Sequence, residues 1–292
     1  MAAPLPPTPI VLCMMPESGH HISDSRGHTG VLGIWKAVKF CAILQQRKTE
    51  IPLSLDFPTH AHHVQFTHSQ PESSLFNFKR NSLKLTIIGD THMRHDELGV
   101  MRGDVLIHVG DMFDLFNRNP EDLAKVDQWY ARQHFDLILC IAGNHDLELE
   151  NREHTNDQPF ENAVYLEDTA FEHKGVNFYG TPWVPDLQTH AFYADEPTLQ
   201  DKWSLIPNET DVLITHTPPA GILDRSSQGM SPGCPHLTDA VTGIAPKIHC
   251  FGHVHASGGS LKCHGINFIN ASCYNQHDGR LRRPVHVRVT TD

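Results

Sequence analysis

The chain has 292 residues, of which 23 are Lys or Arg and 34 are Asp or Glu, so its formal net charge is -11 at pH 7. A chain of this length can bury a sizeable core, as one large domain or two ordinary ones. The acidic balance argues against binding a nucleic acid polymer through a basic surface, although bound metal ions could attract a small anionic ligand locally.

Cysteine usage and the N-terminal sequence bear on the cellular compartment. The seven cysteines contain no C-x-x-C pair and no zinc-finger spacing, which favours a reducing compartment. The apolar run at 10–15 has no basic region before it and is too short for a signal or membrane segment. We therefore expect a cytoplasmic protein that makes no membrane contact.

Residues 1–80 are expected to form an N-terminal extension of low order, because they combine a proline-rich start with scattered histidines and a polar stretch. Within the extension, residues 31–46 could form a short amphipathic helix that docks on the domain. The cluster of His60, His62 and His63 could bind a transition metal. Adventitious binding is the simpler interpretation, since no Cys or carboxylate accompanies the cluster at ligand spacing.

From residue 83 onward, apolar runs alternate with polar or helical segments, which is typical of a layered α/β domain. We expect this domain to span residues 81–292. Strands are predicted at 83–88, 105–109, 137–141, 163–166, 176–179, 212–214, 248–251, 268–269 and 285–289. Helices are predicted at 120–133, 198–203 and 237–242.

Polar side chains that can bind metal ions follow five of the predicted strands. In chain order they are Asp90 and His92, Asp111, Asn144 and His145, His216, and His253 and His255. The glycines beside them would let the backbone turn sharply, and loops at the carboxyl ends of such strands hold ligands. Two Asp, one Asn and four His as ligands, with one further His, suit two first-row divalent ions, and no thiolate is present to indicate structural zinc. His108 and His249 lie inside strands and are expected to be packed or edge residues there.

These strand-end residues match, in order, the pattern of calcineurin-like metallophosphoesterases. The matching motifs are Asp90-x-His92, Gly110-Asp111, Gly143-Asn144-His145-Asp146, His216 and Gly252-His253-x-His255. The resemblance implies a four-layer αββα sandwich with a dinuclear metal centre at the strand ends. Segments 103–111, 180–183, 201–207, 216–219 and 269–272 also resemble the small animal metallophosphodiesterase branch related to class III cyclic-nucleotide phosphodiesterases.

The resemblance also implies a role for each ligand. Asp90, His92 and His255 would hold one ion, and Asn144, His216 and His253 the other, with Asp111 bridging both. Some members of the branch carry a glycine in place of the first His of the last motif, but here that residue, His253, is present. We therefore expect two divalent metal ions, Mn foremost, with Fe, Zn, Co, Ni or Mg as alternatives.

The resemblance implies a phosphodiesterase that depends on a dinuclear metal centre. Its substrate would be a small phosphodiester or nucleotide, with a cyclic nucleotide among the candidates, and the attacking group would be metal-bound hydroxide. His145 would donate a proton to the leaving alkoxide. Asp114 would either orient His145, as the acidic residue at this place does in the wider family, or cap a turn. Leu115 stands where related protein phosphatases carry a phosphate-binding Arg, which weakens the protein phosphatase interpretation. Arg94 could reach a phosphoryl oxygen or be an ordinary loop residue.

Three further side chains and two further functions complete the hypotheses. Trp183 and Tyr274 could stack on a base, with core packing favoured for Trp183, and Asp146 is expected to cap the turn that follows it. The alternative function is a non-catalytic nucleotide- or metal-binding protein whose extension recruits a partner. A nuclease of the same superfamily would need a path for a polyanion, and the acidic chain offers no visible one.

Overall fold

The computed structural model describes residues 82–114, 116, 119, 121–152 and 158–290. The predicted extension, with its helix at 31–46 and its histidine cluster at 60–63, lies outside these residues and stays a prediction. In the described part of the chain no helix is both long and apolar enough to cross a membrane. The five cysteines of that part are buried and none of them forms a disulfide.

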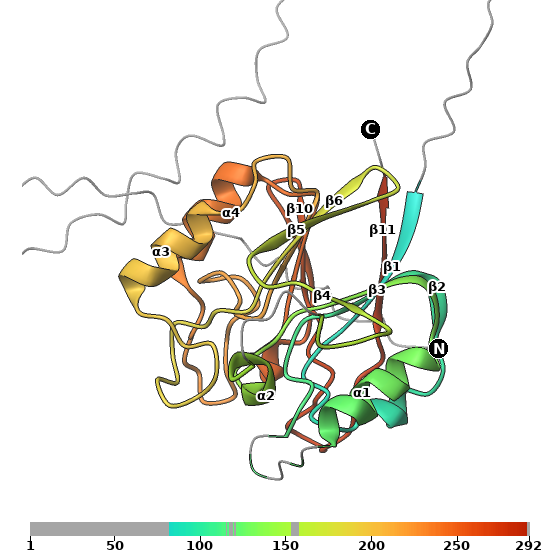
Figure 1. The fold of residues 1–292 in the computed structure, drawn as a ribbon. Coiled ribbons are helices and arrows are strands. Elements are labelled where there is room, and N and C mark those ends of the chain that lie inside the picture. Colours follow the sequence, from blue (N-terminus) through green and yellow to red (C-terminus); the bar gives the residue numbers. More distant parts are fainter. Residues whose placement is uncertain (1–81, 115, 117–118, 120, 153–157, 291–292) are drawn as a thin grey trace, which may run out of the picture. The chain divides into compact units, whose positions relative to one another are not determined.

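Two sheets form the centre of the domain (Figure 1). The first has the order β11-β1-β2-β3-β4, and all its neighbours are parallel except β11 with β1. Its strands are β1 (Ser82–Ile88), β2 (Arg102–His108), β3 (His134–Cys140), β4 (Val164–Tyr165) and β11 (Val285–Thr290). The second has the order β5-β6-β7-β8-β10-β9, and its antiparallel strands, β5 and β9, are at its edges. Its strands are β5 (Thr169–His173), β6 (Val176–Thr181), β7 (Val212–Thr215), β8 (Ile248–Phe251), β9 (Gly259–Cys263) and β10 (Ile266–Asn270).

Helices cover the outer face of each sheet. Figure 1 shows α1 (Asp122–Ala131) on one side of the two sheets and α3 (Glu196–Ser204) with α4 (Pro235–Ile244) on the other. The remaining helices are short: α2 (Leu147–Glu150) and the 3-10 turns His95–Leu98 and His255–Ser257. The helix α3 begins where Asp195 accepts a hydrogen bond from the backbone N–H of Thr198, and Pro235 opens α4.

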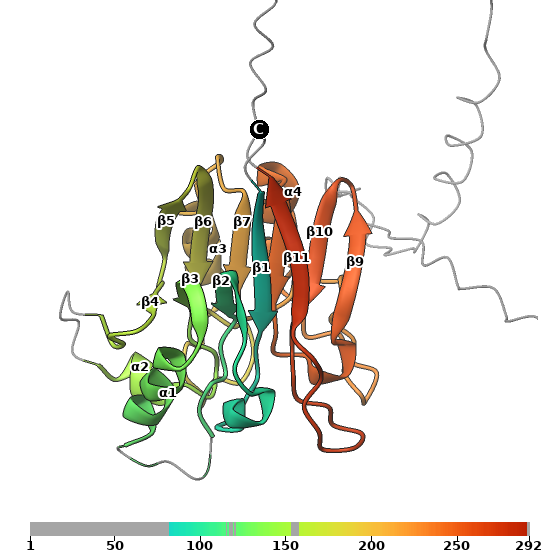
Figure 2. The ribbon, with the colours of Figure 1, turned by 90° about the vertical axis from the view of Figure 1, so that its right-hand side faces the viewer.

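Three apolar layers hold these elements together. One lies between the sheets and includes Leu85 and Ile214, a second lies under α1 around Trp129, and a third lies under α3 and α4 around Phe268 and Leu237. The central strands are therefore buried on both faces, which explains their continuous apolar runs. Figure 2 shows the strands of both sheets lying along nearly the same axis, with the antiparallel strands pointing the opposite way. The predicted four-layer αββα architecture is confirmed.

Each predicted strand has a counterpart within the sheets, but β5 and β9 were not predicted. Both are edge strands whose side chains are largely exposed or half-buried, so neither carries an apolar run or a clear alternation. The helix predicted at 120–133 is shorter, because α1 begins at Asp122 and ends at Ala131; residue 120 lies outside the described residues. The other two predicted helices extend further at each end.

His108 and His249 are packed inside the sheets, as predicted. The Nε2 atom of His108 lies 3.0 Å from Thr91 Oγ1, and that of His249 lies 2.9 Å from Thr215 Oγ1. Burial lowers the pKa of each imidazole to about 3. Both rings are therefore neutral in the folded protein at any pH near neutrality.

The buried His249 should make stability fall in weak acid. A histidine in the unfolded chain has a pKa of about 6.5, whereas burial lowers the pKa of His249 to about 3. Between these pH values the unfolded state therefore binds a proton at this residue and the folded state does not. The free energy of unfolding should fall as the pH drops below about 6.5, by about 1.4 kcal/mol per pH unit for this group. His249→Gln should reduce the loss between pH 7 and pH 5 by about 2 kcal/mol, measured by urea denaturation. Exposed His134→Gln is the control; equal pH slopes for parent and His249→Gln would contradict the prediction.

Candidate metal centre

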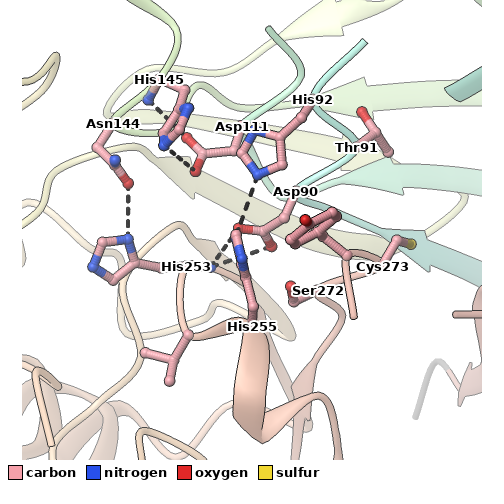
Figure 3. A network of polar contacts seen from close by, with 12 residues as sticks. Asp90, Thr91, His92, Asp111, Asn144, His145, His253, His255, Ser272 and Cys273 are labelled. Atoms are coloured by element: carbon pink, nitrogen blue, oxygen red, sulfur yellow. Dashed lines mark hydrogen bonds and ion pairs between the residues drawn. The ribbon is translucent and has the colours of Figure 1, made fainter. Parts of the chain in front are cut away.

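The strand-end side chains are brought together because the parallel strands of each sheet end at the same edge. Asp90 and Asp111 follow β1 and β2 in the first sheet, and His216 and His253 follow β7 and β8 in the second. Asn144 follows β3. Figure 3 shows the side chains of Asp90, Asp111, Asn144 and His253 converging on one point.

Two carboxylates and two imidazoles form the first donor set. Asp90, His92, Asp111 and His255 each offer one ligand atom, and these atoms all lie within 4.8 Å of one another. The His92 and His255 Nε2 atoms are 3.3 Å apart, and His255 Nε2 is 3.1 Å from Asp90 Oδ1. Both carboxylates are buried. Buried oxygen and nitrogen donors that converge in this way fit a divalent cation.

An amide oxygen and two imidazoles form the second donor set beside the first. Asn144 Oδ1 lies 3.0 Å from His216 Nε2 and 2.8 Å from His253 Nδ1. His216 Nε2 also lies 3.4 Å from Asp111 Oδ1. Asp111 therefore borders both sets, as a bridging ligand would, and the structure brings together all seven predicted ligands.

Backbone carbonyls orient two of the histidines. The Nδ1 atom of His216 lies 2.8 Å from the carbonyl oxygen of Val109, and that of His92 lies 3.3 Å from the carbonyl oxygen of Phe113. A carbonyl can only accept, so each Nδ1–H donates and each Nε2 is the nitrogen that faces the donor sets.

The backbone at the strand ends is shaped for close approach. Asp90, Asp111 and His253 have φ values of 50, 54 and 67°, a left-handed conformation that costs a non-glycine residue about 1–3 kcal/mol. At Gly143, a Cβ atom would collide with Asp111 Oδ1 and with His216 Cε1, 2.5 Å away. This glycine therefore clears space for the donor sets themselves.

The ionisable groups of the two sets stabilise each other's charge. Burial raises the pKa of Asp90, but the hydrogen bond and charge of His255 outweigh burial and lower it. Burial likewise opposes ionisation of Asp111, and the charge of His216 lowers its pKa well below the usual value. Burial lowers the pKa of His216, but Asp111 outweighs burial and raises it to about 10. Protons on these imidazoles supply the positive charge that bound metal ions would supply, so metal binding should release these protons.

His145 lies beside the donor sets. Its backbone N–H donates to Asp111 Oδ1 at 2.8 Å, and its ring centroid is 4.6 Å from that of His92. Its Nδ1 atom is buried and has no hydrogen-bond partner in the described part of the chain. Burial lowers its pKa to about 4 against the opposing effect of Asp111. The imidazole is therefore neutral at pH 7, and an anionic substrate would have to raise its pKa before the ring could act as an acid.

A cavity of about 350 Å³ opens next to the first donor set and His145. It is lined by His92, Arg94, Asp114, Phe116, His145, His255 and Tyr274. The Arg94 guanidinium donates to both carboxylate oxygens of Glu97 and to the carbonyl oxygen of Gly279. Asp114 Oδ1 accepts from the backbone N–H of Phe116 at 2.8 Å, which is the turn-capping alternative. Substrate binding by Arg94 and orientation of His145 by Asp114 stay predictions.

Trp183 and Tyr274, the two aromatic residues that could stack on a base, have different environments. Trp183 donates from Nε1 to Asp168 at 3.0 Å, Lys202 Nζ lies 4.1 Å from its ring centroid, and the side chain packs against the apolar layers under α1 and under α3 and α4. Tyr274 lines the cavity, with its ring 5.2 Å from that of His255. Of the two, Tyr274 is placed to contact a ligand.

The expected role of Asp146 was wrong. Its side chain makes no capping hydrogen bond to the helix that follows it. Its Oδ1 accepts from the backbone N–H groups of Met112 and Phe113, at 2.9 and 3.0 Å, and its Oδ2 accepts from that of Gly143, at 2.8 Å. Asp146 therefore ties the loop after Asp111 to the loop that carries Asn144.

Asp146→Ala should destabilise the protein by at least about 3 kcal/mol, because each of three buried N–H groups left unpaired costs about 1–3 kcal/mol. The free energy of unfolding from urea titration measures the loss. Asp104→Ala is the matched control, because Asp104 accepts a single backbone N–H, that of Lys84. Losses of equal size in the two variants would contradict the structural role of Asp146.

Comparison with known proteins places this site in a family. The model of the calcineurin-like phosphoesterases matches residues 83–257, and the chain belongs to that family. It is 35% identical over 218 residues to UPF0046 protein K07C11.7 of Caenorhabditis elegans, covering 70% of this chain and 74% of the relative. It is 30% identical over 234 residues to human metallophosphoesterase domain-containing protein 1, covering 71% of each. Membership indicates metal-dependent hydrolysis of phosphoesters.

Among solved structures, TT1561 of Thermus thermophilus is similar with a TM-score of 0.46 and 11% identity, covering 65% of this chain and 89% of that chain. At this level the likeness supports no conclusion about substrate.

Asp186 and His190 are two polar residues near the metal centre that the sequence did not predict. Asp186 Oδ1 lies 3.2 Å from His253 Nε2, and the ring of His190 lies 6.2 Å from that of His145. Both lie in the loop between β6 and α3, where Asp186 comes five residues and His190 nine residues after the end of β6. No spacing or periodicity in the sequence marks them.

Proposed function

We propose that this protein is a two-metal phosphodiesterase that hydrolyses a small phosphodiester, a cyclic nucleotide among the candidates. The observation that supports this most strongly is the position of Asp111. It belongs to the donor set of Asp90, His92 and His255, and its Oδ1 is also 3.4 Å from His216 of the second set. Two donor sets that share one carboxylate suit a pair of ions rather than a single one.

The donors fit divalent first-row metals. Asp90, His92, Asp111 and His255 would hold one ion, and Asp111, Asn144, His216 and His253 the other. Imidazole nitrogen with carboxylate and amide oxygen favours borderline cations, and we expect Mn foremost. When bound, such ions supply Lewis-acid activation of water and of the phosphoester, and they offset the charge of the leaving oxygen.

The chain's own groups orient the reaction. Asp111 accepts the backbone N–H of His145, which places this imidazole at the wall of the cavity next to the first donor set. A phosphodiester bound there would bring its leaving oxygen within reach of His145, and its negative charge would favour the protonated ring. Proton transfer to the leaving alkoxide would then come from His145.

The cavity supports a small substrate. A volume of about 350 Å³ is at the lower end of small-molecule sites, and the formal net charge of -11 disfavours a polymer of phosphates. Tyr274 and Phe116 at the wall could contact an apolar or aromatic group of the substrate. We propose accordingly that neither a nucleic acid polymer nor a membrane is a partner.

Metal analysis coupled to a substrate panel tests the function. The full chain would be stripped of metal, reloaded with Mn²⁺ and assayed on phosphomonoesters, linear diesters and cyclic nucleotides. We expect turnover of diesters that scales with metal occupancy and stops on chelation. Turnover that survived stringent chelation would contradict the mechanism. Stoichiometric binding of nucleotide and metal without turnover would instead favour the non-catalytic alternative.

We also propose a cytoplasmic location. The five described cysteines are free thiols buried in the core, as is usual for proteins of a reducing compartment. Microscopy of the tagged full chain in cells would test this.

A further inference from the structure

We infer that Asp186 is a positioning residue that fixes the ring of His253 for the second metal ion, an inference that rests on the proposed two-metal function. Asp186 belongs to none of the strand-end motifs. It lies in the loop between β6 and α3, and its Oδ1 is 3.2 Å from His253 Nε2.

The contact determines which nitrogen of His253 faces the centre. A carboxylate can only accept, so Nε2–H donates to Asp186, and Nδ1 is the nitrogen that faces the second donor set. Nδ1 is the atom that lies 2.8 Å from Asn144 Oδ1. The His253 side chain is only 8% exposed, so its ring has little room to turn away. Asp186 thus selects the tautomer that can bind a metal.

Asp186 also compensates for a difference in charge between the two donor sets. The first set contains the carboxylate of Asp90, whereas the second has the neutral amide of Asn144. The partners of His92 and His216 are neutral backbone carbonyls, but the partner of His253 is a carboxylate. A carboxylate behind a ligating imidazole makes the ring more basic and adds negative charge close to the ion.

The loop that carries Asp186 is held in place by backbone hydrogen bonds. The N–H of Val184 donates to the carbonyl of Phe192 at 2.9 Å, and the N–H of Ala194 donates to the carbonyl of Val184 at 3.1 Å. The N–H of Ala191 donates to the carbonyl of Asn144 at 3.1 Å, so the loop is joined to the second donor set itself. This is why a carboxylate that is 36% exposed can hold a fixed geometry.

The competing interpretation is an ordinary surface ion pair, which would contribute little. The chain offers a matched example in Glu196 and His236, whose Oε1 and Nε2 atoms are 2.8 Å apart on α3 and α4. That pair has the same chemistry but lies on the outer helices. Glu196→Gln is therefore the control for removing a carboxylate from a histidine.

Titration of Mn²⁺ into the metal-free full chain by calorimetry tests the inference. The parent should show two binding steps. Asp186→Ala should weaken one step by about 10–100-fold and leave the other within about twofold of the parent. Asp186→Asn, which keeps an acceptor oxygen and loses the charge, should fall between them, and Glu196→Gln should match the parent.

Repeating the titration in two backgrounds identifies the affected ion. In Asn144→Ala, where the second set is disabled, Asp186→Ala should not change the remaining step. In His92→Ala it should still weaken the remaining step. Parental affinities for both ions in Asp186→Ala, or a loss in the Asn144→Ala background, would overturn the inference. Circular dichroism checks folding, and if Asp186→Ala does not fold, parental affinities in Asp186→Asn are the overturning result.

The two proposals fail in different ways. A parent that binds two ions but hydrolyses no phosphodiester would contradict the proposed function and leave the binding test of Asp186 intact. A parent that binds and hydrolyses, with Asp186→Ala binding equally well, would contradict only the inference. A parent that binds fewer than two ions would overturn both.

Discussion

Asp111→Asn should lower phosphodiester turnover by roughly 10³-fold or more. A bridging carboxylate would help to hold both ions, and the charge of the ions would stabilise the transition state by several kcal/mol. The substitution removes one negative charge from a buried site shared by two donor sets. Asn keeps an oxygen that can accept the N–H of His145, so the fold should survive. Steady-state turnover at saturating Mn²⁺ and the metal content after dialysis measure the effect.

Asp136→Asn is the matched control for Asp111→Asn, because Asp136 is an exposed carboxylate in an ion pair with Lys174. It should leave both turnover and metal content unchanged. If Asp111→Asn retained two ions and near-parental turnover, the bridging role would be wrong. Turnover lost equally in both variants would instead point to a general effect of charge.

His145→Asn should separate proton donation from metal binding. We expect metal content to stay at the parental value, because His145 lies beside the donor sets and is not needed to complete either one. Turnover of an alkyl diester, whose leaving alkoxide needs a proton, should fall roughly 10²–10⁴-fold. Turnover of bis(4-nitrophenyl) phosphate, whose leaving group departs without a proton, should fall less than about tenfold.

The comparison of the two substrates is the decisive measurement for His145. Equal losses on the alkyl and aryl diesters would mean that His145 acts through binding or positioning, and equal rates for variant and parent on the alkyl diester would remove it from the mechanism. His134→Asn, on an exposed strand residue, should match the parent on both substrates. A metal content below the parental value would place His145 among the ligands.

The candidate site was predictable because its residues follow apolar runs. Ile88, Thr215 and Phe251 end buried strands, and the next polar side chains point out of the sheet edge where parallel strands finish. Burial on both faces gives each of these strands a continuous apolar run, which can be recognised in the sequence without knowing the neighbouring strands. Edge strands β5 and β9 lack such a signal, since solvent on one face permits polar residues.

The chain by itself determined the layered α/β class, the order of the strand-end motifs and the chemical type of the donors, because apolar runs and the residues that end them are local properties of the sequence. The αββα arrangement was implied by the resemblance to the calcineurin-like family. Only the tertiary structure decided what Asp146 and Asp186 contact. Asp146 binds backbone groups of a loop more than thirty positions away, and Asp186 meets His253 across two sheet-end loops. A carboxylate accepts from whichever donor lies within about 3 Å, and that proximity is set by the packing of loops, which has no period in the sequence.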